Sequence, residues 1–204
     1  MTEFTTRFAE SKHIFDELFA VSGYTFMYGC GSYLFDGQSY AYSDLMLGKQ
    51  ELLYNEVKTA SHVLEVGTYM GHSLLIMLLS NSSLKITCID IDDRFSRPCV
   101  DVLNKYFDNR VTFIHSDSLS ALWNLNQQNA DFDFFHIDGF HENDYIEKEF
   151  SLVRQLNGDR KVLRIIFDDQ ECLLKLQEYI AANFTVLKKI VPDSRWSSVY
   201  FELV

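Results

Sequence analysis

The 204-residue sequence is poor in the features that mark specialised classes of protein. Its composition, 47% hydrophobic and 23% charged residues, is close to the globular average and excludes a disordered or fibrous chain. The four cysteines are scattered with no CxxC pair, and a chain of this length can bury a core without disulfides or metals. No apolar run approaches the ~18 residues of a membrane span, and no signal-peptide pattern is visible. We therefore expect a cytoplasmic protein that does not enter a membrane.

Positive charge is also scarce. The sequence has 18 Lys and Arg against 29 Asp and Glu, which gives a net charge of −11. Because so acidic a chain repels nucleic acid and anionic membranes unless its cations cluster, and they do not, neither is expected as a partner. The acidic excess could serve solubility alone, or some of the acids could hold a cation.

Short apolar strands alternate with helices from residue 62 onward. Such strands are typical of a parallel sheet covered by helices on both faces. Strands are predicted at 62–66, 85–89, 111–115, 132–137 and 162–167, and helices at 72–79, 98–107, 119–125, 145–156 and 170–183. The last two β-rich runs, 184–191 and 197–204, are joined by a turn-like link and predict an antiparallel hairpin. The predicted fold is a Rossmann-like, doubly wound α/β sheet of seven strands, mainly parallel.

The first 60 residues have a different pattern. Residues 5–20 and 44–59 show helical spacing of apolar residues, and residues 22–42 combine seven aromatic residues with four glycines. We predict a division into an N-terminal extension, 1–60, and a ligand-binding domain, 61–204. The aromatic segment could close over the site as a lid, and a buried N-terminal cap or a subunit contact is the alternative.

Ligands of doubly wound sheets bind outside the carboxyl ends of the strands. The first strand runs into Gly67 and Gly71, which allow a tight turn and a close approach of a ligand to the backbone. Their spacing is GxxxG, so the GxGxxG dinucleotide fingerprint is not met. Asp90 ends the second strand, about where a cofactor ribose would lie, and fits NAD and other nucleosides equally.

The segment 65–73, EVGTYMGHS, resembles the S-adenosylmethionine loop of class I methyltransferases. It is most similar to the catechol O-methyltransferase-like and related small-molecule O-methyltransferase families, over roughly residues 45–169, and the terminal hairpin matches that fold as well. The resemblance implies S-adenosylmethionine as the cofactor. The residues that it implies as cofactor-binding are Glu65, Gly67, Tyr69, Gly71 and Ser73 in the loop, Asp90 at the ribose and Ser118 at the adenine.

Carboxylates follow the fourth and fifth strands. Asp138 ends the fourth, and Asp168 and Asp169 end the fifth, at the same edge of the sheet. Three converging carboxylates repel unless a cation neutralises them, and oxygen ligands indicate Mg²⁺, with Mn²⁺ or Ca²⁺ as alternatives. The residues alone fit helix and turn caps equally well. The resemblance favours a metal, because metal-dependent O-methyltransferases carry acids at these positions, although the catechol enzymes have Asp-Asn where this chain has Asp-Asp.

His141 lies three residues after Asp138, where the catechol enzymes carry a catalytic lysine. An imidazole there could take a proton near neutral pH, and a loop histidine or a metal-shell group is the alternative. The resemblance thus implies a metal-assisted methyltransferase acting on a hydroxyl of a small molecule, with His141 and Asp138 as catalytic residues. A nicotinamide-dependent oxidoreductase and a catalytically silent binding protein are the rival interpretations. Enzymes of this type are often homodimers or larger, which leaves the oligomeric state open.

Overall fold

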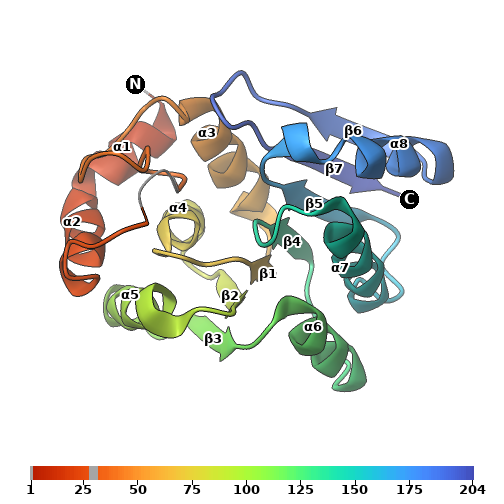
Figure 1. Cartoon of the computed structure of the whole chain (residues 1–204), viewed down its shortest axis with the longest axis horizontal. Coiled ribbons are helices and arrows are strands. Elements are labelled where there is room, and N and C mark those ends of the chain that lie inside the picture. The colour runs from red at the N-terminus through yellow and green to blue at the C-terminus, as the bar shows by residue number, and fades with distance from the viewer. Residues whose placement is uncertain (1, 28–31) are drawn as a thin grey trace.

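A seven-stranded sheet forms the centre of the computed structural model, which describes residues 2–27 and 32–204 (Figure 1). The strands are β1 (His62–Val66), β2 (Lys85–Asp90), β3 (Val111–His115), β4 (Phe134–Ile137), β5 (Leu163–Phe167), β6 (Val186–Ile190) and β7 (Val199–Leu203). Their order in the sheet is β3-β2-β1-β4-β5-β7-β6. Strands β1 to β5 pair in parallel, whereas β7 is antiparallel to both β5 and β6. The predicted mainly parallel sheet with a C-terminal antiparallel hairpin is confirmed.

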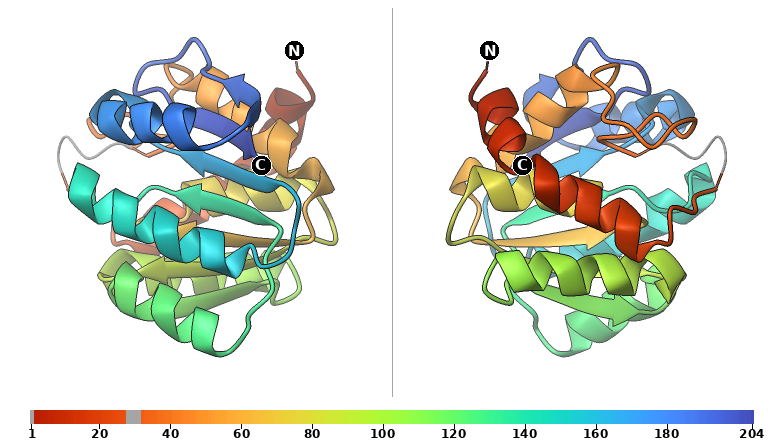
Figure 2. Two further views of the ribbon diagram at one scale, coloured as in Figure 1. Left: turned by 90° about the vertical axis from the view of Figure 1, so that its right-hand side faces the viewer. Right: turned by 90° about the vertical axis from the view of Figure 1, so that its left-hand side faces the viewer.

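Helices cover both faces of the sheet (Figures 1 and 2). One face carries α3 (Leu47–Glu56), α4 (His72–Ser80) and α5 (Asp93–Tyr106), and the other carries α6 (Ser118–Gln127), α7 (Asn143–Leu156) and α8 (Leu174–Asn183). The N-terminal helices α1 (Glu3–Glu10) and α2 (Lys12–Val21) lie outside α4 and α5 as a further layer. Short 3₁₀ turns, Val57–Thr59 and Gln170–Cys172, follow α3 and precede α8. No helix of the described ranges, 2–27 and 32–204, is long and apolar enough to cross a membrane.

Alternate strand residues enter two separate hydrophobic cores, as the two-residue period of a strand requires. In β1, Val63 packs with the side chains of α1 to α5, whereas Leu64 packs with those of α6 to α8. Phe4 and Phe8 of α1 belong to the first of these cores. The N-terminal extension is therefore packed into the same fold as the sheet.

Most predicted elements are found with small shifts at their ends. The predicted helix 5–20 is divided at Ser11 into α1 and α2. Helix α5 begins at Asp93, five residues before its predicted start, because the side chain of Asp92 accepts a hydrogen bond from the N–H of Arg94 and caps the helix. The sequence placed this start at Pro98, which instead lies inside the helix.

The aromatic segment 22–42 does not form one exposed lid. Tyr33, Leu34 and Phe35 are at most 1% exposed and belong to the first core, which agrees with a buried cap. Tyr24 and Tyr40 are exposed. Residues 28–31, which include one aromatic residue of the predicted lid, lie outside the described residues, and the lid stays a prediction for the exposed part of the segment.

Gly67 sets the distance between the ends of β1 and β4. Its φ is +85°, and a Cβ at this position would lie 1.9 Å from the backbone oxygen of Asp138. Only glycine permits both the conformation and the approach. The N–H of Asp138 donates to the carbonyl of Val66 at 2.7 Å, so β1 and β4 stay paired up to their carboxyl ends. The glycine of the predicted cofactor loop thus brings the predicted catalytic acid beside that loop.

We expect Gly67→Ala to lower the free energy of unfolding by more than about 3 kcal/mol, because the new methyl group overlaps a backbone carbonyl and φ is unfavourable. Gly158→Ala is the matched control, since Gly158 has φ +58° and open space around its Cβ position. Gly158→Ala should lower the free energy of unfolding by about 1 kcal/mol, because only the unfavourable φ opposes the alanine. Urea unfolding of both variants measures the difference, and equal losses would show that the contact with Asp138 does not matter.

Candidate functional site

A cavity of about 550 Å³ opens at the carboxyl edge of the sheet, beside the ends of β1 to β4. It lies where the strand order reverses between β1 and β4, the position at which doubly wound sheets bind ligands. Its volume falls within the range of small-molecule sites. The lining combines polar residues and backbone at the strand ends with aromatic rings, namely Gly67, Asp90, Ser118, Asp138 and Gly139, with Tyr69, Phe95, Phe140 and Tyr145.

Four of the residues predicted to bind the cofactor, Gly67, Tyr69, Asp90 and Ser118, line this cavity. The other three, Glu65, Gly71 and Ser73, lie behind the loop. Glu65 and Ser73 are 0% and 4% exposed, and the Ser73 hydroxyl donates to Glu65 Oε1. Gly71 adopts φ +69° immediately before α4. In this structure these three residues support the loop, and their direct contact with a cofactor stays a prediction.

Asp90 both lines the cavity and holds the loop. Its Oδ2 accepts hydrogen bonds from the backbone N–H groups of Thr68 and Tyr69 at 2.9 and 2.7 Å and from the Ser96 hydroxyl at 2.8 Å. Its Oδ1 accepts from the N–H of Asp92 at 2.9 Å. The end of β2 is thereby fixed to the turn after β1, so the glycine loop has one defined shape.

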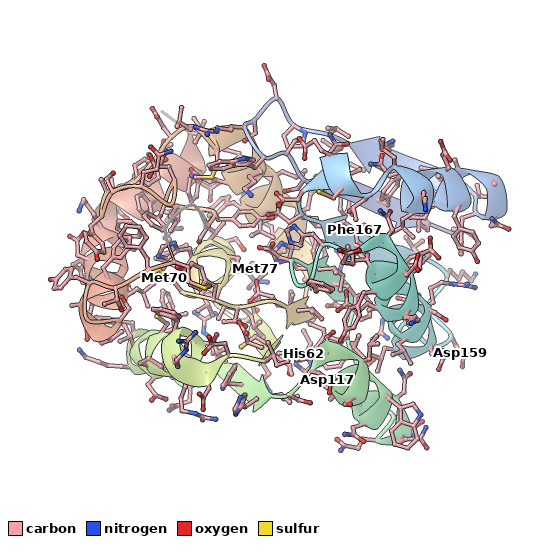
Figure 3. The ribbon with its side chains drawn as sticks, in the orientation of Figure 1. His62, Met70, Met77, Asp117, Asp159 and Phe167 are labelled. Atoms are coloured by element: carbon pink, nitrogen blue, oxygen red, sulfur yellow. The ribbon has the colours of Figure 1, made fainter. Side chains whose placement is uncertain are left out.

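The three predicted acids are brought together, because β4 and β5 are neighbours and Ile137 is paired with Phe167 (labelled in Figure 3). Asp168 is buried, and both its oxygens accept hydrogen bonds from the ammonium of Lys49, at 2.8 and 3.1 Å. Burial by itself would raise the pKa of Asp168, but Lys49 holds it below its usual value. Burial likewise opposes the charge of Lys49, and the carboxylates of Asp168 and Asp138 nevertheless raise its pKa. Both groups therefore stay charged.

His141 lies between the other two acids. Its Nδ1 is 2.8 Å from Asp169 Oδ2, and its Nε2 is 3.6 Å from Asp138 Oδ1. The carboxylates of Asp138 and Asp169 raise the pKa of His141 to about 11, so the imidazolium form dominates near neutral pH. A role of His141 as a proton acceptor stays a prediction. Burial, together with the charge of Asp168, raises the pKa of Asp138 to about 7.

These contacts do not fit the predicted divalent cation at Asp138, Asp168 and Asp169. A hard cation such as Mg²⁺ requires the lone pairs of its carboxylate ligands. Both oxygens of Asp168 already accept from Lys49, and Oδ1 also accepts, at 2.7 Å, from the hydroxyl of Ser198. Among residues 2–27 and 32–204, no group of three or more His, Cys, Asp or Glu side chains is arranged to hold a metal ion. The cation beside Asp168 in this structure is Lys49, and a metal at the three acids stays a prediction.

A continuous chain of buried hydrogen bonds runs beneath the site. From Ser198 it continues to the hydroxyl of Tyr33 at 3.1 Å and to His136 Nε2 at 2.9 Å. His136 Nδ1 is 2.9 Å from Glu65 Oε1, which also accepts from Ser73. The chain thus connects Asp168, at the acid cluster, with the loop after β1. His136 of β4 is fully buried and central to it.

Comparison with known proteins places the chain in a family. The O-methyltransferase family model matches residues 47–160, more than half of the chain. The chain belongs to the O-methyltransferase family. This confirms the family that the glycine loop resembles.

Individual members of the family are more distant. An Arabidopsis thaliana protein, named provisionally as a caffeoyl-CoA O-methyltransferase, is 34% identical over 85 residues, and the match spans 41% of this chain and only 37% of that protein. The Bacillus cereus O-methyltransferase, solved with S-adenosylhomocysteine, has a TM-score of 0.66 at 17% identity over 94% of this chain and 90% of its own. The Streptomyces achromogenes O-methyltransferase TomG, solved with S-adenosylmethionine, has a TM-score of 0.59 at 16% identity over 76% of this chain and 79% of its own. These structures share the fold.

Within this member of the family, sequence reasoning missed Lys49, Tyr33 and Ser198. Lys49 could have been found, because it lies on the helical stripe that includes Leu52 and Leu53 and is therefore a charge at a core position. Tyr33 was one of many aromatic residues in its segment, and Ser198 one serine of a pair after a turn. Neither carries a pattern that distinguishes it.

Glu149 of α7 is a second buried acid next to the cavity of this member of the O-methyltransferase family. It accepts a hydrogen bond from the hydroxyl of Ser118, which follows the α6 cap Asp117 (labelled in Figure 3). Its other oxygen, Oε2, has no hydrogen-bond partner within the described part of the chain. Burial raises the pKa of Glu149 to about 7. Because the folded protein then binds this proton more tightly than the unfolded chain, stability falls as the pH rises from 4.5 to 7.

We expect Glu149→Gln to abolish the loss of stability between pH 4.5 and 7, since glutamine keeps the acceptor for Ser118 and carries no charge. At pH 8 the variant should be more stable than the wild type by on the order of 1–3 kcal/mol, and at pH 4 nearly equal. Chemical unfolding at the two pH values measures this. Glu147→Gln, at an exposed position of the same helix, is the control and should change neither value. A Glu149→Gln variant that is less stable at both pH values would contradict the assignment.

Proposed function

We propose that the chain transfers a methyl group from S-adenosylmethionine to a hydroxyl oxygen of a small molecule. The observation that carries the proposal is one cavity lined by both Asp90 and Asp138, in a chain of the O-methyltransferase family. The residues fit such a cofactor, because Gly67 and Gly139 offer backbone without side chains and aromatic rings provide flat apolar walls. We assign the cofactor to residues 61–204 and the choice of acceptor mainly to residues 1–60, of which Met27 reaches the cavity.

S-Adenosylmethionine, when bound, supplies an electrophilic methyl group on a sulfonium. The protein orients the acceptor so that its oxygen faces this methyl group in line, and it excludes water from the cavity. A cofactor held beside Gly67, Asp90 and Gly139 would give its methyl group to the acceptor oxygen as the sulfur–methyl bond breaks, and the acceptor would release its proton. We propose that the carboxylate of Asp138 receives this proton, because Asp138 lines the cavity and His141 lies beside it.

Binding of S-adenosylhomocysteine, measured by calorimetry, tests the cofactor. Asp90→Ala should weaken it by roughly tenfold to a hundredfold, because a carboxylate that both shapes the loop and lines the cavity is lost. Asp101→Ala, at an exposed position of α5, is the control and should bind as the wild type does. Wild-type protein that binds NADH and not S-adenosylhomocysteine would instead indicate the nicotinamide-dependent alternative.

Transfer itself is tested with radiolabelled S-adenosylmethionine and a panel of hydroxyl compounds: a catechol, a sugar and a polyketide-like phenol. Reactions with EDTA and with added Mg²⁺ test the metal-assisted form of the reaction that the sequence predicts. Cofactor binding without transfer to any hydroxyl compound would favour a protein of this fold that serves in binding.

A further inference from the structure

The acid cluster (Asp138, Asp168 and Asp169) contains a positive charge supplied by the chain itself. The side chain of Lys49 is 3% exposed, and that of Asp168 is 5% exposed. Lys49 Nζ lies within hydrogen-bond distance of both oxygens of Asp168 and 4.4 Å above the ring centre of Tyr33. The ammonium therefore occupies the side of Asp168 on which a metal ion would have to bind both carboxylate oxygens.

The position of Lys49 is fixed by the packing of its helix. Lys49 lies in the first turn of α3, next to Gly48, where a Cβ would be 2.5 Å from the carbonyl oxygen of Asp193. The carbonyl of Leu45 accepts from the N–H of Arg195 at 3.2 Å. The start of α3 is thus held against the link between β6 and β7, close to Ser198, the second donor to Asp168. An approaching cation would have to displace the ammonium of a lysine whose helix is held at its start by these contacts.

We propose that Lys49 takes the place of the divalent cation, so that the acid cluster of this O-methyltransferase neither needs nor binds a metal ion. Lys49 acts through Asp168, whose position it fixes, and is therefore a positioning residue. The inference rests on the proposed function for the role of the site. In place of an exchangeable ion with open coordination positions, the site has a fixed ammonium with one charge and donor hydrogens.

Two substitutions of Lys49 separate the effect of its charge on metal binding from the effect of its side-chain volume. Lys49→Ala removes the ammonium and opens room beside Asp168, whereas Lys49→Met removes the charge and keeps the volume. We expect wild-type protein to show no saturable Mn²⁺ binding by electron paramagnetic resonance. Lys49→Ala should gain saturable binding of one Mn²⁺ per chain, and Lys49→Met should show none. Lys188→Ala, which breaks the partly exposed pair with Glu56, is the control and should behave as the wild type does.

Unfolding measurements give a second readout. Both Lys49 variants should be destabilised, because a buried carboxylate loses its partner. Mn²⁺ should restore stability to Lys49→Ala in proportion to its saturation and should leave Lys49→Met unchanged. If Lys49 were merely structural, both variants would be destabilised and Mn²⁺ would restore the stability of neither.

One bound Mn²⁺ in the wild type, lost in Asp168→Asn, would overturn the proposal, as would a folded Lys49→Ala that gains no Mn²⁺. If Lys49→Ala does not fold, the wild-type titration decides: no saturable binding supports the proposal, and one bound ion overturns it. S-Adenosylhomocysteine binding to the same wild-type sample separates the two inferences. Its absence would count against the proposed function and would leave the Mn²⁺ result unaffected.

Discussion

The ion pair between Asp168 and Lys49 is the interaction on which the rest of this site depends. A buried carboxylate without a partner is unfavourable, and removing one member of such a pair typically costs about 3–5 kcal/mol. The pair therefore joins the carboxyl end of β5, in the sheet, to the first turn of α3, in the helical layer on one face of the sheet. The ring of Tyr33, in the N-terminal extension, lies against the ammonium of Lys49, and the hydroxyl of Ser198, just before β7, donates a further hydrogen bond to Asp168. The ion pair is therefore contacted by residues from four different segments of the chain.

Asp90 and Asp138 line the same cavity in different electrostatic surroundings. The carboxylate of Asp90 accepts from backbone N–H groups of the loop after β1, an arrangement that fixes the shape of that loop without adding a second charge. Around Asp138, carboxylates alternate with a lysine and a histidine. The close approach of Gly67 to Asp138 keeps the loop after β1 beside this acid.

The sequence was sufficient for the sheet and for most of the strand-end residues, because strand length, apolar continuity and the positions of Gly67, Asp90 and Asp138 are local signals. It was not sufficient for the partners of those residues. Lys49 precedes Asp168 by 119 positions, and only the three-dimensional packing of α3 shows that its charge is directed inward. The predicted metal followed from three acids converging at one edge, but the sequence did not show the lysine beside Asp168, which comes from an element with no apparent link to that edge. The contacts of His141 were hidden for the same reason, since its two carboxylate neighbours follow different strands.

The hydrogen-bond chain beneath the site has a consequence for how the protein reaches its native state. Tyr33 and His136 are 103 residues apart, and Tyr33 and Ser198 are 165 apart, so these contacts close very long loops. Contacts of such separation slow folding, because the entropy of loop closure is lost before the contact can compensate for it. Ser198 immediately precedes β7, so the polar interior of the site is complete only when β7 is paired with β5. Without that pairing, Asp168 has only one of its two donors, Lys49.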